Sequence, residues 1–77
     1  MLFAFKKGVT LTGLKGVTVS LLPLGGDAEI AQTTGLKYGA DGVKLSYGSC
    51  LGISNEIINE SAEIILQNGV LLCVVNA

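Results

Sequence analysis

A glycine followed by residues of alternating polarity recurs along this chain. The phrase occurs at Gly8–Thr12, Gly16–Ser20, Gly42–Ser46 and Gly69–Cys73. Alternation with a period of two is typical of a β-strand with one buried face, because successive side chains of a strand point to opposite sides of the sheet. The pattern therefore predicts a β-dominated chain. Strands are expected near residues 2–6, 8–12, 16–22, 28–33, 36–39, 43–48, 56–59, 62–67 and 70–75.

Two segments of the sequence match each other at a spacing of 27 residues. The matched positions are Leu24-Gly25, Glu29-Ile30 and Asp41-Gly42-Val43 against Leu51-Gly52, Glu56-Ile57 and Asn68-Gly69-Val70. Asp-Gly and Asn-Gly are the strongest short-range signals for a tight hairpin turn. The approximate repeat therefore predicts two hairpins, which turn at Asp41-Gly42 and at Asn68-Gly69.

The two predicted hairpins differ in the polarity of their faces. The first has one apolar face, made of Leu36, Tyr38, Ala40, Val43, Leu45 and Tyr47. Its opposite face is polar, with Lys37 and Lys44 among its residues. In the second hairpin the equivalent of this polar face is apolar, and it consists of Ala62, Ile64, Leu66, Leu71, Cys73 and Val75. A chain of 77 residues has little of its own left to cover a second apolar face. We therefore expect these six residues to form the interface of a homo-oligomer, such as a trimer.

Residues 55–67 are also compatible with a helix, which Ser54 would cap and Gly69 would end. The many β-branched residues oppose it, and so do Gly35 and Gly39 in the matched segment upstream. We favour strands and keep one helix at about 55–67 as the alternative. In both cases residues 1–77 form a single small β domain. A small barrel or sandwich is the expected closure, because unpaired strand edges invite uncontrolled pairing.

The composition supports assembly and indicates few other partners. Hydrophobic residues make up 49% of the chain and charged residues 14%, which is unusual for a solitary small domain. A net charge of −1 gives no general attraction to nucleic acid or to an anionic membrane surface. No apolar run approaches the ~18 residues that span a bilayer. Lys6 and Lys7 follow the apolar segment 1–5, the reverse of the order in a signal peptide, so the chain is expected to be made in the cytoplasm.

No motif in the sequence carries chemistry. The chain has no histidine, which excludes Ser-His-Asp and Cys-His arrangements within it. Gly25-Gly26 lacks the lysine and serine or threonine that end a phosphate-binding loop. Cys50 and Cys73 are too far apart for a zinc knuckle; a disulfide between them is left open, and the apolar surroundings of Cys73 favour a buried thiol. We therefore expect no catalytic, cofactor-binding or metal-binding residue, no cofactor and no enzymatic activity.

These observations predict a structural assembly subunit without catalysis. A cement or decoration protein of a viral capsid, or another virion or shell component, fits this description. Its partners would be copies of itself and a larger protein assembly, and its final location would be a virion. The alternative is a small β binding module that receives a peptide strand or an apolar ligand on the 62–75 hairpin.

Overall fold

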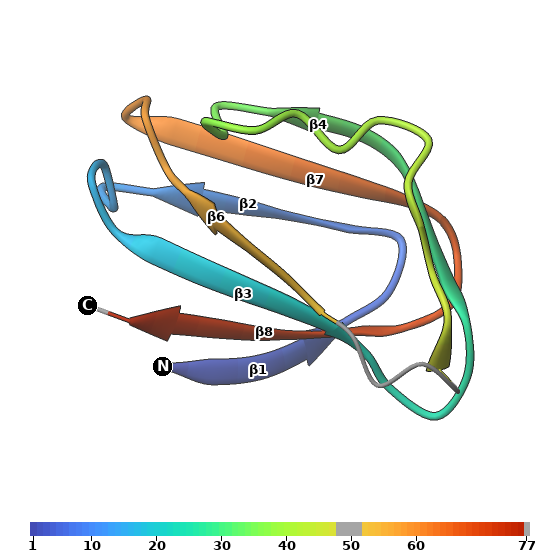
Figure 1. Cartoon of the computed structure of the whole chain (residues 1–77). Helices are drawn as coiled ribbons and strands as arrows, with labels where there is room; N and C mark the ends of the chain where they lie inside the picture. Colours follow the sequence, from blue (N-terminus) through green and yellow to red (C-terminus); the bar gives the residue numbers. More distant parts are fainter. Residues whose placement is uncertain (48–51, 77) are drawn as a thin grey trace.

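In the part of the chain that the structure describes, eight strands form two four-stranded antiparallel sheets that face each other (Figure 1). The computed structural model describes residues 1–47 and 52–76. The strands are β1 Leu2–Phe5, β2 Gly8–Thr12, β3 Thr18–Pro23, β4 Ala28–Thr34, β5 Lys44–Leu45, β6 Ile53–Glu56, β7 Ser61–Asn68 and β8 Leu71–Asn76. The first sheet has the order β1-β8-β3-β6 and the second has the order β2-β7-β4-β5. The prediction of a small all-β domain, a barrel or a sandwich, is confirmed. The alternative helix at 55–67 is wrong, because β6 and β7 occupy most of that range.

The hydrophobic core lies between the two sheets and takes alternate residues from each strand. The strand β8 contributes Leu71, Cys73 and Val75 from the first sheet, and β7 contributes Ala62, Ile64 and Leu66 from the second. These are the six residues that the sequence assigned to an interface between chains. Each has at most 7% of its surface exposed, so they are buried within a single chain and not on a surface that a second chain could cover.

The reason for this difference is the path of the chain at Asn68-Gly69. This turn does not close a hairpin of two paired strands; it carries the chain from β7 in the second sheet to β8 in the first. The inner faces of β7 and β8 therefore meet across the core instead of lying side by side on one sheet. Local turn residues predict a reversal of direction, but they do not decide which strand becomes the hydrogen-bonded partner.

The turn at Asp41-Gly42 forms, but the predicted hairpin around it does not. The Val43 N–H donates to the Ala40 carbonyl over 3.1 Å, which closes the turn. The short strand β5 then pairs with β4, and residues 36–40 contribute no strand. The two segments matched at 27 residues thus take different structures. Of the apolar face predicted for the first hairpin, Leu36, Ala40 and Leu45 are buried, Val43 is half-buried, and Tyr38 and Tyr47 are exposed.

The outer faces of the two sheets differ in polarity. On the first sheet the register places Leu2 beside Val74, and it places Leu72 between Ala4 and Leu22. We call these five residues the outer patch. Their neighbours along each strand point into the core, so the outer patch faces away from it. The strand β8 is therefore apolar on both faces, as its sequence indicates, but the face left uncovered is the opposite of the one that we expected.

The second sheet has a polar outer face. Its register places Glu63 between Thr10 and Thr34. These three residues are exposed, in contrast to the half-buried Leu72 and Val74 of the first sheet. The excess apolar content of the chain is thus concentrated on one side of the sandwich.

The corner between β1 and β2 holds Lys7 in a left-handed backbone conformation, with φ of 74°. The Lys7 carbonyl accepts a hydrogen bond of 2.7 Å from the Leu66 N–H, which ties the corner to β7. A left-handed residue with a Cβ costs about 1–2 kcal/mol, a cost that glycine does not have. We expect Lys7→Gly to raise the free energy of unfolding by about 0.5–1 kcal/mol in urea titrations, after the entropy cost of glycine is subtracted. The neighbouring Lys6→Gly should lower it; an equal or larger gain from Lys6→Gly would contradict this explanation.

Candidate functional site

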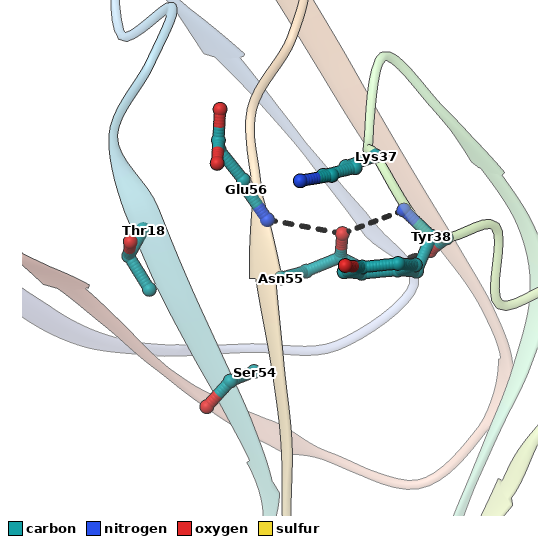
Figure 2. Close-up of a pocket in the computed structure, with 6 residues that line it drawn as sticks. All are labelled: Thr18, Lys37, Tyr38, Ser54, Asn55 and Glu56. Atoms are coloured by element: carbon teal, nitrogen blue, oxygen red, sulfur yellow. Dashed lines mark hydrogen bonds between the residues drawn. The ribbon is translucent and has the colours of Figure 1, made fainter.

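A pocket of about 190 Å³ lies beside β6, where the loop after β4 passes along the edge of the first sheet (Figure 2). Six residues line the pocket: Thr18 from β3; Ser54, Asn55 and Glu56 from β6; and Lys37 and Tyr38 from the loop. The backbone of the loop is joined to the free edge of β6. The Lys37 N–H donates to the Glu56 carbonyl (2.8 Å), and the Ile58 N–H donates to the Gly35 carbonyl (2.9 Å).

Asn55 is the buried polar side chain of this site, with 4% of its surface exposed. Its Oδ1 accepts hydrogen bonds from the Tyr38 N–H (2.9 Å) and from the Glu56 N–H (3.0 Å). Its Nδ2 donates to the Tyr38 carbonyl over 2.6 Å. The side-chain amide therefore satisfies both backbone groups of Tyr38, as a neighbouring strand would. Figure 2 shows the two bonds that Oδ1 accepts as dashed lines.

Tyr38 presents an aromatic ring at the pocket, and 61% of the residue is exposed. The Lys37 Nζ lies over this ring, 5.5 Å from its centroid, in a cation–π contact. Figure 2 shows the ring nearly edge-on, with the Lys37 ammonium group on one side of its plane. Hydroxyls of Thr18 and Ser54 and the Glu56 carboxylate add polar groups to the lining of the pocket. The site can stack a flat ligand and form hydrogen bonds at its edge.

The floor of the pocket continues into the outer patch. Thr18 and Glu56 are opposite each other in the register of β3 and β6, and Ser20 and Ser54 form the next pair on the same face. Ser20 in turn lies beside Val74, which belongs to the outer patch. The pocket and the outer patch are therefore neighbouring parts of one face of the first sheet.

None of the pocket residues was selected from the sequence. The sequence did contain one indication of this site. Asn55 is two residues from Ile53 and from Ile57, so in a strand its side chain lies on the same face as theirs. A polar side chain on an apolar face needs a hydrogen-bond partner. The partner is Tyr38, 17 residues away in a loop, and the spacing of residues along the chain does not reveal that contact.

Among the described residues, neither Cys73 nor a cluster of acidic side chains adds a second site. Burial raises the pKa of the Cys73 thiol, so this free cysteine is an inert core residue. Cys50, and with it the disulfide that was left open, lies outside the described residues. Within residues 1–47 and 52–76, no three His, Cys, Asp or Glu side chains gather to hold a metal ion. In the same ranges, no helix has the length and hydrophobicity needed to cross a bilayer.

Solved structures that share the fold of this chain include two pyrophosphokinases. The thiamin pyrophosphokinase from Geobacillus thermodenitrificans superposes with a TM-score of 0.85 at 26% sequence identity, over 99% of this chain and 36% of that protein. The thiamine pyrophosphokinase from Bacillus subtilis superposes with a TM-score of 0.81 at 23% identity, over 99% of this chain and 36% of that protein. The chain thus spans little more than a third of the length of either. No curated protein matches it.

These similarities overturn the function expected from the sequence. The chain resembles part of two kinases rather than a capsid or shell component, so the prediction of a virion structural subunit is wrong. The prediction of no enzymatic activity is contradicted as well, because both matched proteins are pyrophosphokinases. The first error arose from the core residues of β7 and β8, which the pattern placed on a surface. The second arose because the absence of histidine excludes only the catalytic groups that contain histidine.

The description of the matching family agrees with these structures. A family model described as thiamin pyrophosphokinase, vitamin B1 binding domain, matches residues 6–71. The matched range contains all six residues that line the pocket. The chain belongs to the family of vitamin B1 binding domains of thiamin pyrophosphokinase.

Proposed function

We propose that this chain binds thiamin in the pocket beside β6, as the vitamin-binding part of a thiamin pyrophosphokinase. The observation that supports this most directly is the presence of a pocket with an exposed aromatic ring in a domain of a vitamin B1 binding family. Thiamin contains an aminopyrimidine ring with hydrogen-bond donors and acceptors at its edge. The Tyr38 ring offers a stacking surface, and the Thr18 and Ser54 hydroxyls can donate or accept at that edge.

The size of the pocket indicates how much of the ligand it holds. Its volume of about 190 Å³ is below the roughly 300–1,000 Å³ of sites that enclose a whole small molecule. We infer that one ring of thiamin occupies the pocket and that the rest of the molecule extends beyond it. The transfer of pyrophosphate is proposed for the kinase as a whole, since this chain spans 36% of the length of the kinases that it matches.

Self-association remains part of this proposal, with a different surface from the one that the sequence suggested. The outer patch is an apolar surface outside the core, and it adjoins the pocket through Ser20. It carries no charged side chain, so a second copy packing on it would desolvate no charge. The virion location is withdrawn with the virion function.

The binding proposal is tested by calorimetric titration of the chain with thiamin. We expect Tyr38→Ala to weaken binding about tenfold, because aromatic stacking of a heterocycle contributes about 1–3 kcal/mol. Tyr47→Ala is the matched control, since Tyr47 is exposed to a similar extent and does not line the pocket. Its affinity should equal that of the unaltered chain. Equal losses in both variants, or no binding by the unaltered chain, would contradict the proposed site.

A further inference from the structure

The side-chain amide of Asn55 forms hydrogen bonds within the protein on both its oxygen and its nitrogen. Its oxygen accepts two backbone hydrogen bonds, and its nitrogen donates to the Tyr38 carbonyl. The bond to the Glu56 N–H orients the amide, because it links the side chain to the backbone of the next residue. With 4% of its surface exposed, Asn55 has little contact with the open part of the pocket.

Tyr38 depends on these contacts for its position. The preceding residue, Lys37, is anchored by its N–H to the Glu56 carbonyl (2.8 Å). The next anchor along the loop is the Ala40 N–H, which donates to the Thr33 Oγ1 (3.0 Å). Between these two points the backbone of Tyr38 is held on both its N–H and its C=O by Asn55.

The Tyr38 ring cannot hold itself in place by packing. The residue is 61% exposed, and the Lys37 ammonium group over the ring comes from an exposed, flexible side chain. An exposed cation–π contact is weak compared with two partly buried hydrogen bonds to the Tyr38 backbone. The direction of the ring is therefore set by the backbone that carries it, and that backbone is fixed by Asn55.

We propose that Asn55 is the positioning residue of the thiamin site: it holds the Tyr38 ring in the wall of the pocket through the Tyr38 backbone and makes no contact with the ligand itself. This inference rests on the proposed function, because it assumes that the pocket receives a ring of thiamin. Asn55 then affects the affinity for thiamin only by holding Tyr38 in position.

A double-mutant cycle separates this role from direct contact. Thiamin affinity is measured by calorimetry for the unaltered chain, Asn55→Ala, Tyr38→Ala and the double variant, each checked for native circular dichroism. We expect Asn55→Ala to weaken binding about tenfold when Tyr38 is present and less than twofold in the Tyr38→Ala background, because the ring that it positions is then missing. The same tenfold loss in both backgrounds would show direct contact with thiamin and overturn the proposal.

Hydrogen exchange gives a second readout that needs no ligand. We expect Asn55→Ala to speed exchange of the Tyr38 amide at least tenfold and to leave the Thr33 amide, which donates to Asp41 Oδ1 (2.7 Å), unchanged. An unchanged Tyr38 rate would overturn the positioning role. If Asn55→Ala does not fold, the exchange rate of the Tyr38 amide in the unaltered chain decides instead. Exchange at the rate of an unprotected amide would overturn the positioning role, and slower exchange would support it. If the unaltered chain does not bind thiamin, the proposed function fails, and the positioning role is judged by exchange alone.

Discussion

Leu71→Lys is expected to unfold this protein, whereas Leu72→Lys in the next position is expected to leave it folded. Leu71 has no exposed surface and points into the core from β8, which lies inside its sheet between β1 and β3. Loss of a buried leucine costs about 2–5 kcal/mol. A buried, unpaired ammonium group costs several kcal/mol more. Because a small domain is stable by only about 5–15 kcal/mol in total, the variant should be unfolded at room temperature.

Leu72 differs from Leu71 in the side of the sheet to which it points. It is half-buried on the outer face, where the long stem of a lysine can lie on the patch while its ammonium group remains in water. Far-UV circular dichroism and a thermal melt of both variants test the pair. A native spectrum for Leu71→Lys would show that Leu71 lies on a surface, as the sequence pattern suggested. The native mass of Leu72→Lys tests self-association in the same samples, since a charge on the outer patch should dissociate any oligomer that forms there.

Gly69→Ala is expected to be far more damaging than Gly16→Ala, which shows how much of the damage is due to backbone conformation alone. Both glycines have φ of 88°. A Cβ on Gly16 would meet nothing within 4 Å, so the variant carries only the left-handed strain of about 1–2 kcal/mol. A Cβ on Gly69 would lie 2.5 Å from the Asp27 carbonyl oxygen and 2.6 Å from the Ala28 Cα. These are backbone atoms, and moving them would displace the start of β4.

The added clash should bring the total loss for Gly69→Ala to about 3–4 kcal/mol, because overpacking costs about 1–3 kcal/mol beyond the strain. Urea denaturation of the two variants gives the difference in unfolding free energy directly. Losses that are equal within about 0.5 kcal/mol would show that the corner between β7 and β8 can widen to admit a Cβ without lowering the unfolding free energy. In that case the close approach of Gly69 to Ala28 does not contribute to stability.

The strand pattern was predictable because it depends on neighbours in the sequence. The phrase at Gly8–Thr12 corresponds to β2 residue for residue, and the apolar run near 70–75 becomes β8 with a shift of one residue. The stretch 36–39 was predicted as a strand by the same rule and is a loop. Its backbone is held by the edge of β6 and by the Asn55 side chain rather than by a strand of the second sheet. Alternation predicts that a segment is extended, but it does not say which partner satisfies its backbone.

The alternation of polar and apolar residues could not predict the candidate site either, because it does not identify partners that are distant in the sequence. Lys37 and Tyr38 are separated from Asn55 by a turn, by β5 and by a further stretch of chain, and they meet only because β6 pairs with β3 on one side and receives the loop on the other. The inward parity of Asn55 was the one local sign of a buried polar contact. Its partner could be known only after the sheets were assembled.

The sequence by itself determined that this protein is a small all-β domain, that β8 is apolar on both faces, and that the apolar content exceeds what one small core needs. These properties follow from composition and from the period-two geometry of strands. The tertiary structure alone decided which face of β8 is inside, because that choice depends on Asn68-Gly69 crossing between the sheets. It also decided where the pocket is, because a hydrogen bond between residues 17 positions apart is a consequence of strand pairing and not of the local sequence.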